Sequence, residues 1–515
     1  MAFAARTIGS MDVVKSHHGR AAELLLEFAR GLKAEDQLSR IASDLVGSDA
    51  EIVGPFGVKP LIYADYVASG RALWSVERFI ADKVLPYYAN SHTEASYCGA
   101  FTTALRQAAR QVIADCCEAN AQHAVIFSGS GATAGLNRLV GLLGINAGSR
   151  AARPRVILGP YEHHSNILPW RESIAEVVEI GESETGGPDL SQLDAALRVT
   201  DDRLVVCAFS AASNVTGIVS DVAGITQRAK IAGAKVVWDF AGAGPYMPIS
   251  MRPSEHAEID AIVISPHKFI GGPGSSGILI VRKDAVVADK PTWPGGGTVR
   301  FVSPTCHDYS DSLETREEGG TPNVLGDIRA GLVFLVKDVT GIETIASRNA
   351  ELTAKVFAAW GGIEEIEILG NVRAPRLPIF SLRIKDGRGG YVHQQLVTRM
   401  LSDRYGIQAR GGCACAGPYV HHLLNIDAAQ SNKIRDQIFA GDELQKPGFT
   451  RLNFSVLLPD EKVNFILECV IQLSRDAPNL ASCYIADAKR AIFSPRLAGE
   501  TISNASALHV GPEGV

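Results

Sequence analysis

The sequence predicts an α/β fold in which helices cover both faces of a mostly parallel sheet. Between about residues 120 and 285, short runs rich in Val and Ile alternate with helix-like segments; the runs are AVIF, RVILG, RLVVCAF, KVVWDF, DAIVIS and GILIVRK. Such alternation is typical of parallel strands joined by helical crossovers. In these sheets ligands bind beyond the carboxyl ends of the strands, so we expect functional residues to follow the runs directly.

The remaining segments predict three smaller parts around this large domain, which spans residues 61–335. Residues 1–60 contain the amphipathic segment AAELLLEFARGL and predict an N-terminal helical arm. Beyond residue 335, a long stretch of helical spacing precedes short strands and helices, so we expect a small α+β C-terminal domain over residues 336–492. The tail, residues 493–515, is small and polar, and we expect it to be poorly ordered.

Composition limits the classes of partner. The net charge is -6 over 515 residues, with no run of Lys or Arg, which argues against nucleic acid or an anionic membrane as a principal partner. No apolar stretch reaches the roughly 18 to 20 residues that cross a bilayer, and the N-terminus shows no basic region followed by an apolar run. We therefore expect a soluble, cytoplasmic protein whose nine cysteines are reduced thiols.

A glycine-rich turn follows the first predicted strand. In SGSGATAGLNRLVGLL, residues 128–143, this turn opens onto a helix. The N–H groups of Gly131, Ala132 and Thr133, together with the positive end of the helix dipole, suit a phosphate group. Such turns also occur for steric reasons alone, so this segment by itself leaves both interpretations open.

Two further strand ends carry ionisable residues. KVVWDF places Asp239 at the end of a buried strand, where an acid is costly unless it is paired. Asp239 either caps the next loop or faces a protonated ring nitrogen, as the acidic partner of a pyridoxal cofactor does. In DAIVISPHKFIGGPGSSGILIV, Lys268 follows a strand among apolar residues and glycines, which suits a lysine that loses its proton and forms a Schiff base. Ser265 and His267 are placed to hold a phosphate beside it.

These segments belong to a run of motifs that extends from Tyr63 to Ser455: YADYVASG, NSH, SGSGATAGLN, YEHHSNILPW, SNVTG, DFAG, SPHKFIGGPGSSG, EEGGTPN, RGGCACAG and TRLNFS. The run resembles that of the class V aminotransferase and cysteine desulfurase group of fold-type I enzymes, which depend on pyridoxal 5'-phosphate (PLP). The strings GGGTVRF and RGGCAC also resemble parts of the PLP domain of molybdenum cofactor sulfurases. The resemblance implies a fold-type I transferase whose large domain binds PLP.

The resemblance also implies a role for each matched residue. Lys268 would form the Schiff base with PLP, Asp239 would hold the proton on the ring nitrogen, and His163 would stack on the ring and transfer protons. Asn214 would contact the ring oxygen or the substrate, and Arg451 would pair with the substrate carboxylate through its planar guanidinium. The cofactor phosphate would contact Thr133, Ser265, His267 and, from the neighbouring subunit of a homodimer, Thr321.

The loop RGGCACAGPY, residues 410–419, carries two thiols. In the resembling enzymes the catalytic cysteine stands five residues after the arginine, a position that is Cys415 here, and Cys413 falls where a histidine often stands. A thiolate that attacks substrate sulfur and then passes it outward needs a flexible carrier, and glycines supply that freedom. Two alternatives stay open: a metal site that adds His421 and His422, and thiols without a catalytic role.

The sequence thus supports three functional hypotheses. The first is a PLP-dependent cysteine desulfurase that converts L-cysteine to L-alanine and leaves a persulfide on Cys415, with a sulfur-acceptor protein as a candidate partner. The second is another class V PLP enzyme, an aminotransferase or β-eliminating lyase, in which Cys415 has no catalytic role. The third is a non-catalytic partner protein of the same fold, and the presence of Lys268, Asp239 and Arg451 argues against it.

Overall fold

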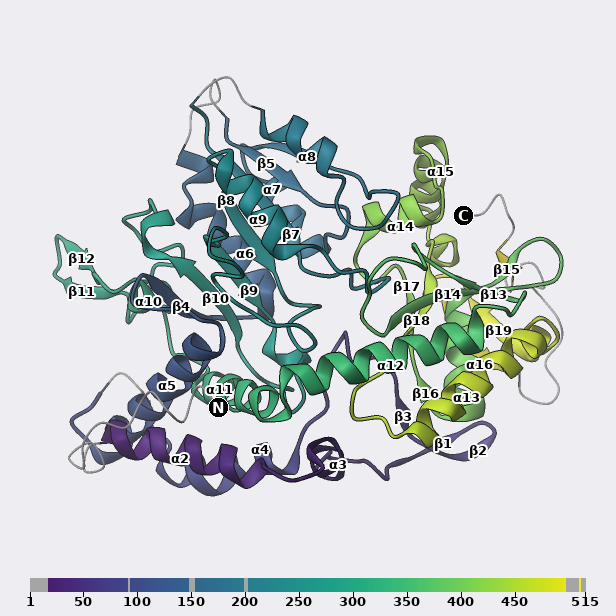
Figure 1. Ribbon diagram of the computed structural model, residues 1–515, viewed down its shortest axis with the longest axis horizontal. Coiled ribbons are helices and arrows are strands. Elements are labelled where there is room, and N and C mark those ends of the chain that lie inside the picture. Colours follow the sequence, from purple (N-terminus) through teal and green to yellow (C-terminus); the bar gives the residue numbers. More distant parts are fainter. Residues whose placement is uncertain (1–16, 91–92, 148–152, 199–201, 497–508, 511–515) are drawn as a thin grey trace.

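The computed structural model describes residues 17–90, 93–147, 153–198, 202–496 and 509–510 (Figure 1). Several expected features lie outside the described residues: the first 16 residues of the arm, Ser91 and His92 of the NSH motif, and most of the tail. The boundaries between the expected parts of the chain stay predictions.

The large half of the molecule is built on a seven-stranded sheet. Its strands, in spatial order, are β4 (His123–Gly129), β10 (Gly277–Arg282), β9 (Ala261–Ile264), β8 (Lys235–Asp239), β7 (Val205–Ser210), β5 (Arg155–Leu158) and β6 (Glu176–Glu179). Neighbours pair in parallel except β10, which is antiparallel to both β4 and β9. The predicted α/β fold with a mostly parallel sheet is confirmed. The edge strand β6 was not predicted, because its sequence EVVE holds a single apolar pair.

Both faces of this sheet are buried. On β8, Val236 and Trp238 belong to one apolar cluster, and Val237 between them belongs to another. Burial of each such side chain contributes roughly 1.5 to 3 kcal/mol. Helices α5 (Tyr97–Cys116), α8 (Leu190–Leu197), α9 (Val222–Ile231) and α11 (Val324–Thr340) pack into the first cluster. Helices α6 (Gly131–Leu142), α7 (Leu168–Arg171) and α10 (Leu313–Glu317) pack into the second.

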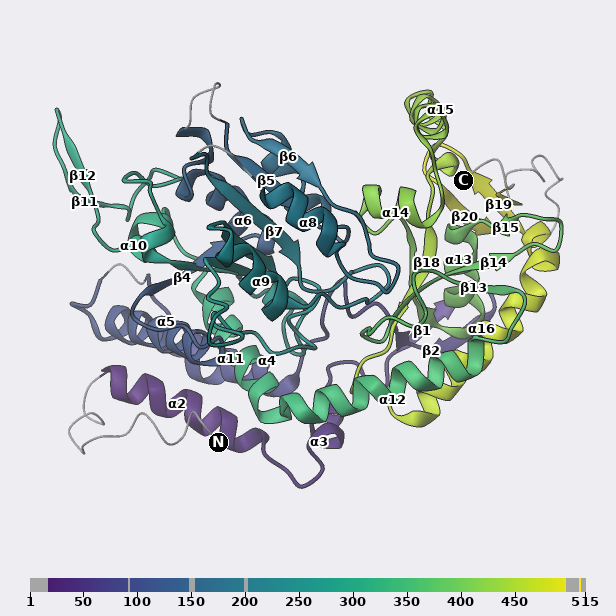
Figure 2. The same ribbon diagram turned by 45° about the horizontal axis from the view of Figure 1, so that its top comes forward.

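The N-terminal segment is helical only in part. Helix α2 (His17–Leu32) lies along α5 in both views and buries Leu25 and Leu32 in the first cluster (Figures 1 and 2). Helix α3 (Gln37–Ser43) follows, and then β1 (Glu51–Gly54) and β2 (Gly57–Pro60) form a hairpin where a helical arm was expected. The Pro-Phe-Gly turn and the β-branched residues beside it favour this hairpin. Strand β3 (Ile62–Tyr63) and helix α4 (Trp74–Phe79) complete this part.

The C-terminal half carries a second sheet. Its strand order is β17 (Arg410–Gly412), β18 (Phe449–Asn453), β14 (Ile379–Lys385), β15 (Tyr391–Val392) and β21 (His509–Val510), and β13 (Ile366–Ile368) also pairs with β14. Its helices are α12 (Ile342–Trp360), α13 (Gln394–Tyr405), α14 (Gly417–Leu423), α15 (Ala428–Phe439) and α16 (Asp460–Leu480). Helix α12 runs from the large half to this sheet in Figure 1.

Several shorter strands complete the fold. Strand β16 (Ile407–Gln408) pairs in parallel with β3, and β19 (Tyr484–Asp487) pairs with β20 (Ile492–Pro495). The hairpin of β11 (Val299–Val302) and β12 (His307–Tyr309) projects from the large half, and α15 projects from the small one (Figures 1 and 2). Each helix that the structure describes is too short or too polar to cross a membrane.

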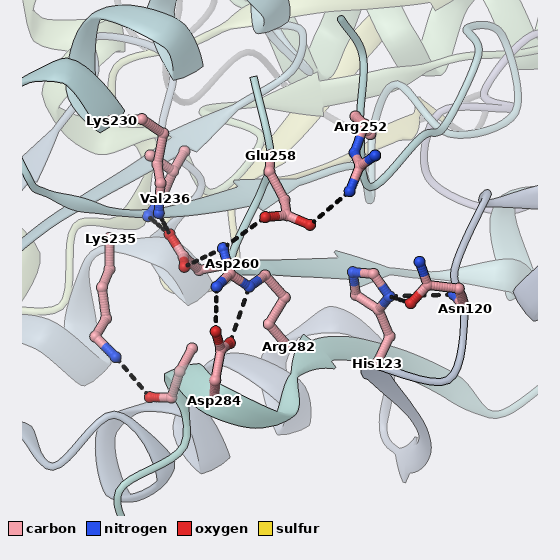
Figure 3. A network of polar contacts seen from close by, with 11 residues as sticks. Asn120, His123, Lys230, Lys235, Val236, Arg252, Glu258, Asp260, Arg282 and Asp284 are labelled. Atoms are coloured by element: carbon pink, nitrogen blue, oxygen red, sulfur yellow. Dashed lines mark hydrogen bonds and ion pairs between the residues drawn. The ribbon is translucent and has the colours of Figure 1, made fainter. Parts of the chain in front are cut away.

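A polar network fixes the sheet at its edge opposite the strand ends described below (Figure 3). Asp260, directly before β9, accepts hydrogen bonds from the Val236 N–H at 2.8 Å and from Lys230 Nζ at 2.7 Å. Arg282, at the end of β10, donates to Glu258 at 3.0 Å. Because Asp260 is buried, these charge-assisted bonds tie β8, β9 and β10 together.

Candidate active site

A cavity of about 270 Å³ opens beyond the carboxyl ends of β7, β8 and β9. Its lining includes Ser210, Asp239 and Ser265, which stand at or directly after these strand ends. The C-terminal half closes the other side. Every predicted site residue except Thr321 lines the cavity: Gly131, Ala132, Thr133, His163, Asn214, Asp239, Ser265, His267, Lys268, Cys415 and Arg451.

Lys268 reaches the cavity from the one-turn helix η6 (Pro266–Lys268) that follows β9. Its removal from bulk water lowers the pKa of Lys268 to about 8; the charge of Asp239 opposes this shift and that of Arg451 adds to it. A substantial fraction of such an amine is unprotonated near neutral pH, and the unprotonated form is the nucleophile. Lys268 is therefore suited to covalent attachment of an aldehyde.

Asp239 ends β8 as a buried carboxylate, 4% exposed. Its Oδ1 accepts a hydrogen bond from the Ala241 N–H at 2.7 Å. Burial raises the pKa of Asp239, while the Ala241 bond and the Lys268 charge act in the opposite direction. A buried carboxylate at a cavity wall is stabilised by a cation or by a protonated ring nitrogen placed against it.

The amino end of α6 forms a cradle for an anion. At Gly131, where φ is +60°, a Cβ atom would lie 3.1 Å from both Ser265 Oγ and His267 Cε1, so the positive φ and the close approach both favour glycine. The Ala132 N–H donates to Ser265 Oγ at 3.0 Å, and its contact with a phosphate stays a prediction. Since Ser265 Oγ is the acceptor in that bond, its own O–H remains available to an anion.

His163 is neutral at physiological pH. Burial, and then the nearby positive charge of Lys268, lower the pKa of His163 to about 4. Its Nδ1 accepts the Ser165 N–H at 3.1 Å, which places the ring proton on Nε2. A neutral imidazole suits stacking on a ring, but with this pKa it is a weaker base than Lys268. Burial likewise lowers the pKa of His267 to about 4, so His267 would meet a phosphate as a neutral donor.

Arg451 is held by Asp65, a residue that the sequence analysis did not single out. Asp65 accepts from Arg451 Nη2 at 2.7 Å and from Arg410 Nε at 2.9 Å. Arg451 Nη1 donates to the Asn214 carbonyl at 2.9 Å, and its buried Nε has no hydrogen-bond partner within the described part of the chain. One guanidinium edge is thus fixed, and the unpaired Nε–H suits a substrate carboxylate.

Asn214 contacts the thiol loop, which we define as residues 413–416 between β17 and α14. Its Nδ2 donates to the Ala414 carbonyl at 2.8 Å, and its buried Oδ1 has no partner among the described residues. The predicted contact with a ring oxygen or substrate would therefore use the second amide hydrogen of Asn214. An unsatisfied buried oxygen at a cavity wall is typical of a site that receives a polar ligand.

The structure separates the two loop thiols. Cys415 is exposed and lines the cavity. Cys413 is half-buried and packs against an apolar cluster that contains Tyr419 and Phe449. The thiol that shares the cavity with Lys268 is thus the one at the predicted nucleophile position.

The metal-site alternative receives no geometric support. Across the described ranges, no three His, Cys, Asp or Glu side chains come together as metal ligands. Both ring nitrogens of His421 lie close to oxygen atoms, Nδ1 at 2.8 Å from the Gly417 carbonyl and Nε2 at 3.1 Å from Ser431 Oγ. Both ring nitrogens of His421 are therefore engaged within the C-terminal half.

Thr321 is the predicted site residue that the structure does not bring to the cavity. It is exposed in the segment between α10 and α11. Within the described chain it lies outside the cavity lining, so any contact with a cofactor would have to be made in another subunit.

The family model described as aminotransferase class-V matches residues 62–434. The chain belongs to the class-V aminotransferase family. Among curated relatives, a cysteine desulfurase of Pectobacterium atrosepticum is 29% identical over 393 residues, which cover 75% of this chain and 90% of that protein. A cysteine desulfurase of Enterobacter sp. is 30% identical over 364 residues, which cover 70% of this chain and 85% of that protein.

Solved structures show the same fold. A cysteine desulfurase from Thermococcus onnurineus superposes with a TM-score of 0.66 at 23% identity, over 81% of this chain and 95% of that one. A cysteine desulfurase from Escherichia coli gives a TM-score of 0.64 at 21% identity, over 85% of this chain and 98% of that one. These likenesses confirm the predicted fold-type I architecture.

Proposed function

We propose that this protein is a PLP-dependent cysteine desulfurase that converts L-cysteine to L-alanine and leaves the sulfur as a persulfide on Cys415. One observation carries the proposal: the Lys268 amine, the Arg451 guanidinium and the Cys415 thiol meet in one cavity. The activity printed for the relatives, cysteine desulfurase, supports it.

The described residues fit PLP. The glycine cradle at Gly131, the buried carboxylate of Asp239 and the unsatisfied Asn214 Oδ1 all border the cavity. Asp239 would pair with the ring nitrogen, Lys268 would bind the aldehyde carbon and His163 would stack on the ring; the phosphate would contact Gly131, Thr133, Ser265 and His267. When bound, PLP withdraws electrons from the substrate α-carbon.

Three side chains of the protein would then carry out the successive steps. Arg451 orients the substrate carboxylate, and Lys268, the stronger base, takes the proton from the α-carbon. The Cys415 thiolate attacks the substrate sulfur, so that a sulfur–sulfur bond forms and the bond between sulfur and the β-carbon breaks. The electron pair of the broken bond stays on the β-carbon, which takes up a proton and becomes the methyl group of alanine. The step needs no external oxidant, because the carbon is reduced as the sulfur is oxidised.

Product analysis tests this proposal. The PLP-loaded protein is incubated with L-cysteine, and alanine, pyruvate, free sulfide and protein-bound sulfane sulfur are quantified. We expect alanine and protein-bound sulfur in equal amounts. Pyruvate with free sulfide would favour a β-eliminating lyase, and the lack of all four products would favour a non-catalytic protein.

The rate of PLP attachment to the apoprotein is expected to rise with pH and to level off above about pH 8. Only the unprotonated amine attacks an aldehyde, and burial lowers the pKa of Lys268 from 10.5 to about 8. The reactive fraction therefore rises about tenfold per pH unit below that value. Stopped-flow absorbance between about pH 6 and 10 measures this rate. A rate that still rises steeply near the upper limit would show that Lys268 keeps an ordinary pKa.

We also propose a homodimer in which Thr321 reaches the partner's phosphate. The segment that carries Thr321 is bonded to Gly296 through the Gly320 N–H at 2.8 Å. The adjoining hairpin β11–β12 presents Phe301 and Val302, which are 53% and 62% exposed. Exposed apolar side chains on a projecting hairpin suit a protein interface. Because Cys415 has to be a free thiol to attack sulfur, we further propose a cytoplasmic location, where thiols stay reduced, and a protein acceptor for the sulfur.

Dilution of the protein below the dimer dissociation constant is expected to lower PLP retention and turnover in parallel. A Thr321→Ala variant should release PLP faster while it stays dimeric, since it removes one phosphate contact and leaves Phe301 in place. Sedimentation equilibrium gives the subunit state, and cofactor absorbance gives the retention. A fully active monomer that retains PLP would contradict the shared site.

A further inference from the structure

The thiol loop and Gly417, the first residue of α14, are tied to the large half by three hydrogen bonds. The backbone N–H of His164 donates to the Cys415 carbonyl at 2.8 Å. The N–H of Gly417 donates to His164 Nε2 at 2.9 Å. Asn214 Nδ2 donates to the Ala414 carbonyl at 2.8 Å. Two of the three bonds therefore come from one residue, the second histidine of the EHHSN motif.

The backbone that these bonds hold is strained. Ala414 has a φ of +49° and Cys415 has a φ of +54°, so two consecutive residues with side chains occupy the left-handed region. Steric contact between Cβ and the backbone disfavours this region for residues other than glycine. A loop in this conformation would relax to another one if its bonds to the large half opened.

The position and the protonation state of His164 suit this contact. It stands in the one-turn helix η5 (His164–Asn166) and is not part of the cavity lining. Burial and the charge of Arg171 lower the pKa of His164, which keeps Nε2 unprotonated and able to accept a hydrogen bond. At Gly417, a Cβ atom would lie 3.1 Å from His164 Nε2, so the close approach favours glycine.

The segment that follows the loop is fixed separately. The Tyr419 side chain on α14 is buried, and its hydroxyl donates to both carboxylate oxygens of Glu182 at 3.2 Å. On the other side, β17 pairs with β18. The chain is therefore held on both sides of residues 413–416.

We propose that His164 is a positioning residue that latches the thiol loop onto the large half, so that Cys415 faces the cavity. Opening of this latch releases the strained loop and turns Cys415 away from the cavity. The hydrogen bonds of the latch do not depend on which reaction the protein catalyses. The effect of the latch on sulfur transfer rests on the proposed function.

Hydrogen exchange followed by mass spectrometry tests the latch without turnover. The reporter is the Ala416 N–H, which bonds within the loop to the Cys413 carbonyl at 3.1 Å and is therefore not one of the groups that bond to His164. In a His164→Leu variant we expect the Ala416 N–H to exchange about five- to tenfold faster, the change that corresponds to the loss of one ordinary hydrogen bond. His164→Gln should restore the slow rate, because its Oε1 can accept the Gly417 N–H. Glu172→Gln, an exposed change just beyond α7, is the matched control and should change nothing.

A second variant changes Gly417, the residue whose N–H donates to His164. Gly417→Ala leaves His164 in place but sets a methyl group against Nε2, so it should also speed exchange at Ala416. Gly417→Ala therefore tests whether the latch exists even if His164→Leu fails to fold. If exchange at Ala416 stays at the wild-type rate in Gly417→Ala and in a folded His164→Leu variant, the latch does not exist.

Single-turnover kinetics connects the latch to the chemistry. In His164→Leu, persulfide formation on Cys415 should slow by about five- to tenfold, while the spectral titration with L-cysteine gives the wild-type affinity, because Lys268 and Arg451 are untouched. Equal persulfide rates in His164→Leu and wild type would overturn the positioning role. If the wild-type protein forms no persulfide but the exchange pattern holds, the latch stands and the proposed function fails.

Discussion

A Lys268→Ala variant is expected to fold normally, to bind PLP without a covalent bond and to lose turnover by at least about 10³-fold. The loss is this large because Lys268 supplies both the attachment point and the base with a pKa of about 8 at the cavity. Circular dichroism checks the fold, absorbance checks the cofactor, and alanine release measures turnover.

Lys337 provides the comparison for this prediction. Burial lowers its pKa also to about 8, but its Nζ donates to the carbonyls of Gly244 at 2.6 Å and Met247 at 2.5 Å, and it does not line the cavity. Borohydride reduction of the wild-type protein should fix PLP to Lys268 alone. A label on Lys337 or on any other lysine would contradict the assignment.

A Cys415→Ser variant is expected to keep PLP and the spectral response to L-cysteine but to form no persulfide. Lys268 and Arg451 are unchanged in this variant, so substrate binding persists. A serine hydroxyl is almost wholly protonated at neutral pH and attacks sulfur far more slowly than a thiolate does. Persulfide is measured by cyanolysis after one turnover.

Cys413→Ser is the matched control, two residues away on the same loop. Cys413 packs against the apolar cluster around Tyr419 and Phe449 and does not line the cavity. We therefore expect Cys413→Ser to slow persulfide formation by at most about tenfold, or roughly 1.4 kcal/mol of barrier. If Cys413→Ser abolished the persulfide and Cys415→Ser kept the wild-type rate, the nucleophile would be Cys413. Full activity of both variants and of the double variant would favour the hypothesis of an enzyme without a catalytic thiol.

Local sequence patterns predicted the parts of the structure that depend on local interactions. The Val- and Ile-rich runs identified the central strands, and the residues directly after them, such as Asp239 and Lys268, do line the cavity. Hydrophobic periodicity could not find β6, which is short and bears a glutamate at each end. The β1–β2 hairpin was also missed, since its two strands are short and half-exposed.

The remaining features depend on contacts between residues far apart in the chain. Asp65 holds Arg410 and Arg451 across 345 and 386 residues, and Asn214 reaches Ala414 across 200. Nothing in the residues around Asp65 indicates these partners. In the same way, the residues around Ala132 give no sign of the bond from its N–H to Ser265, 133 residues away.

The most direct test of the central claim is to locate the transferred sulfur after a single turnover. PLP-loaded protein is mixed with less than one equivalent of L-cysteine, quenched with an alkylating reagent, digested and examined by mass spectrometry, while alanine is quantified in the same sample. We predict one additional sulfur atom on the peptide that carries Cys415, on that residue, in an amount equal to the alanine formed. Alanine without sulfur on Cys415, or sulfur on another cysteine, would contradict the proposed mechanism.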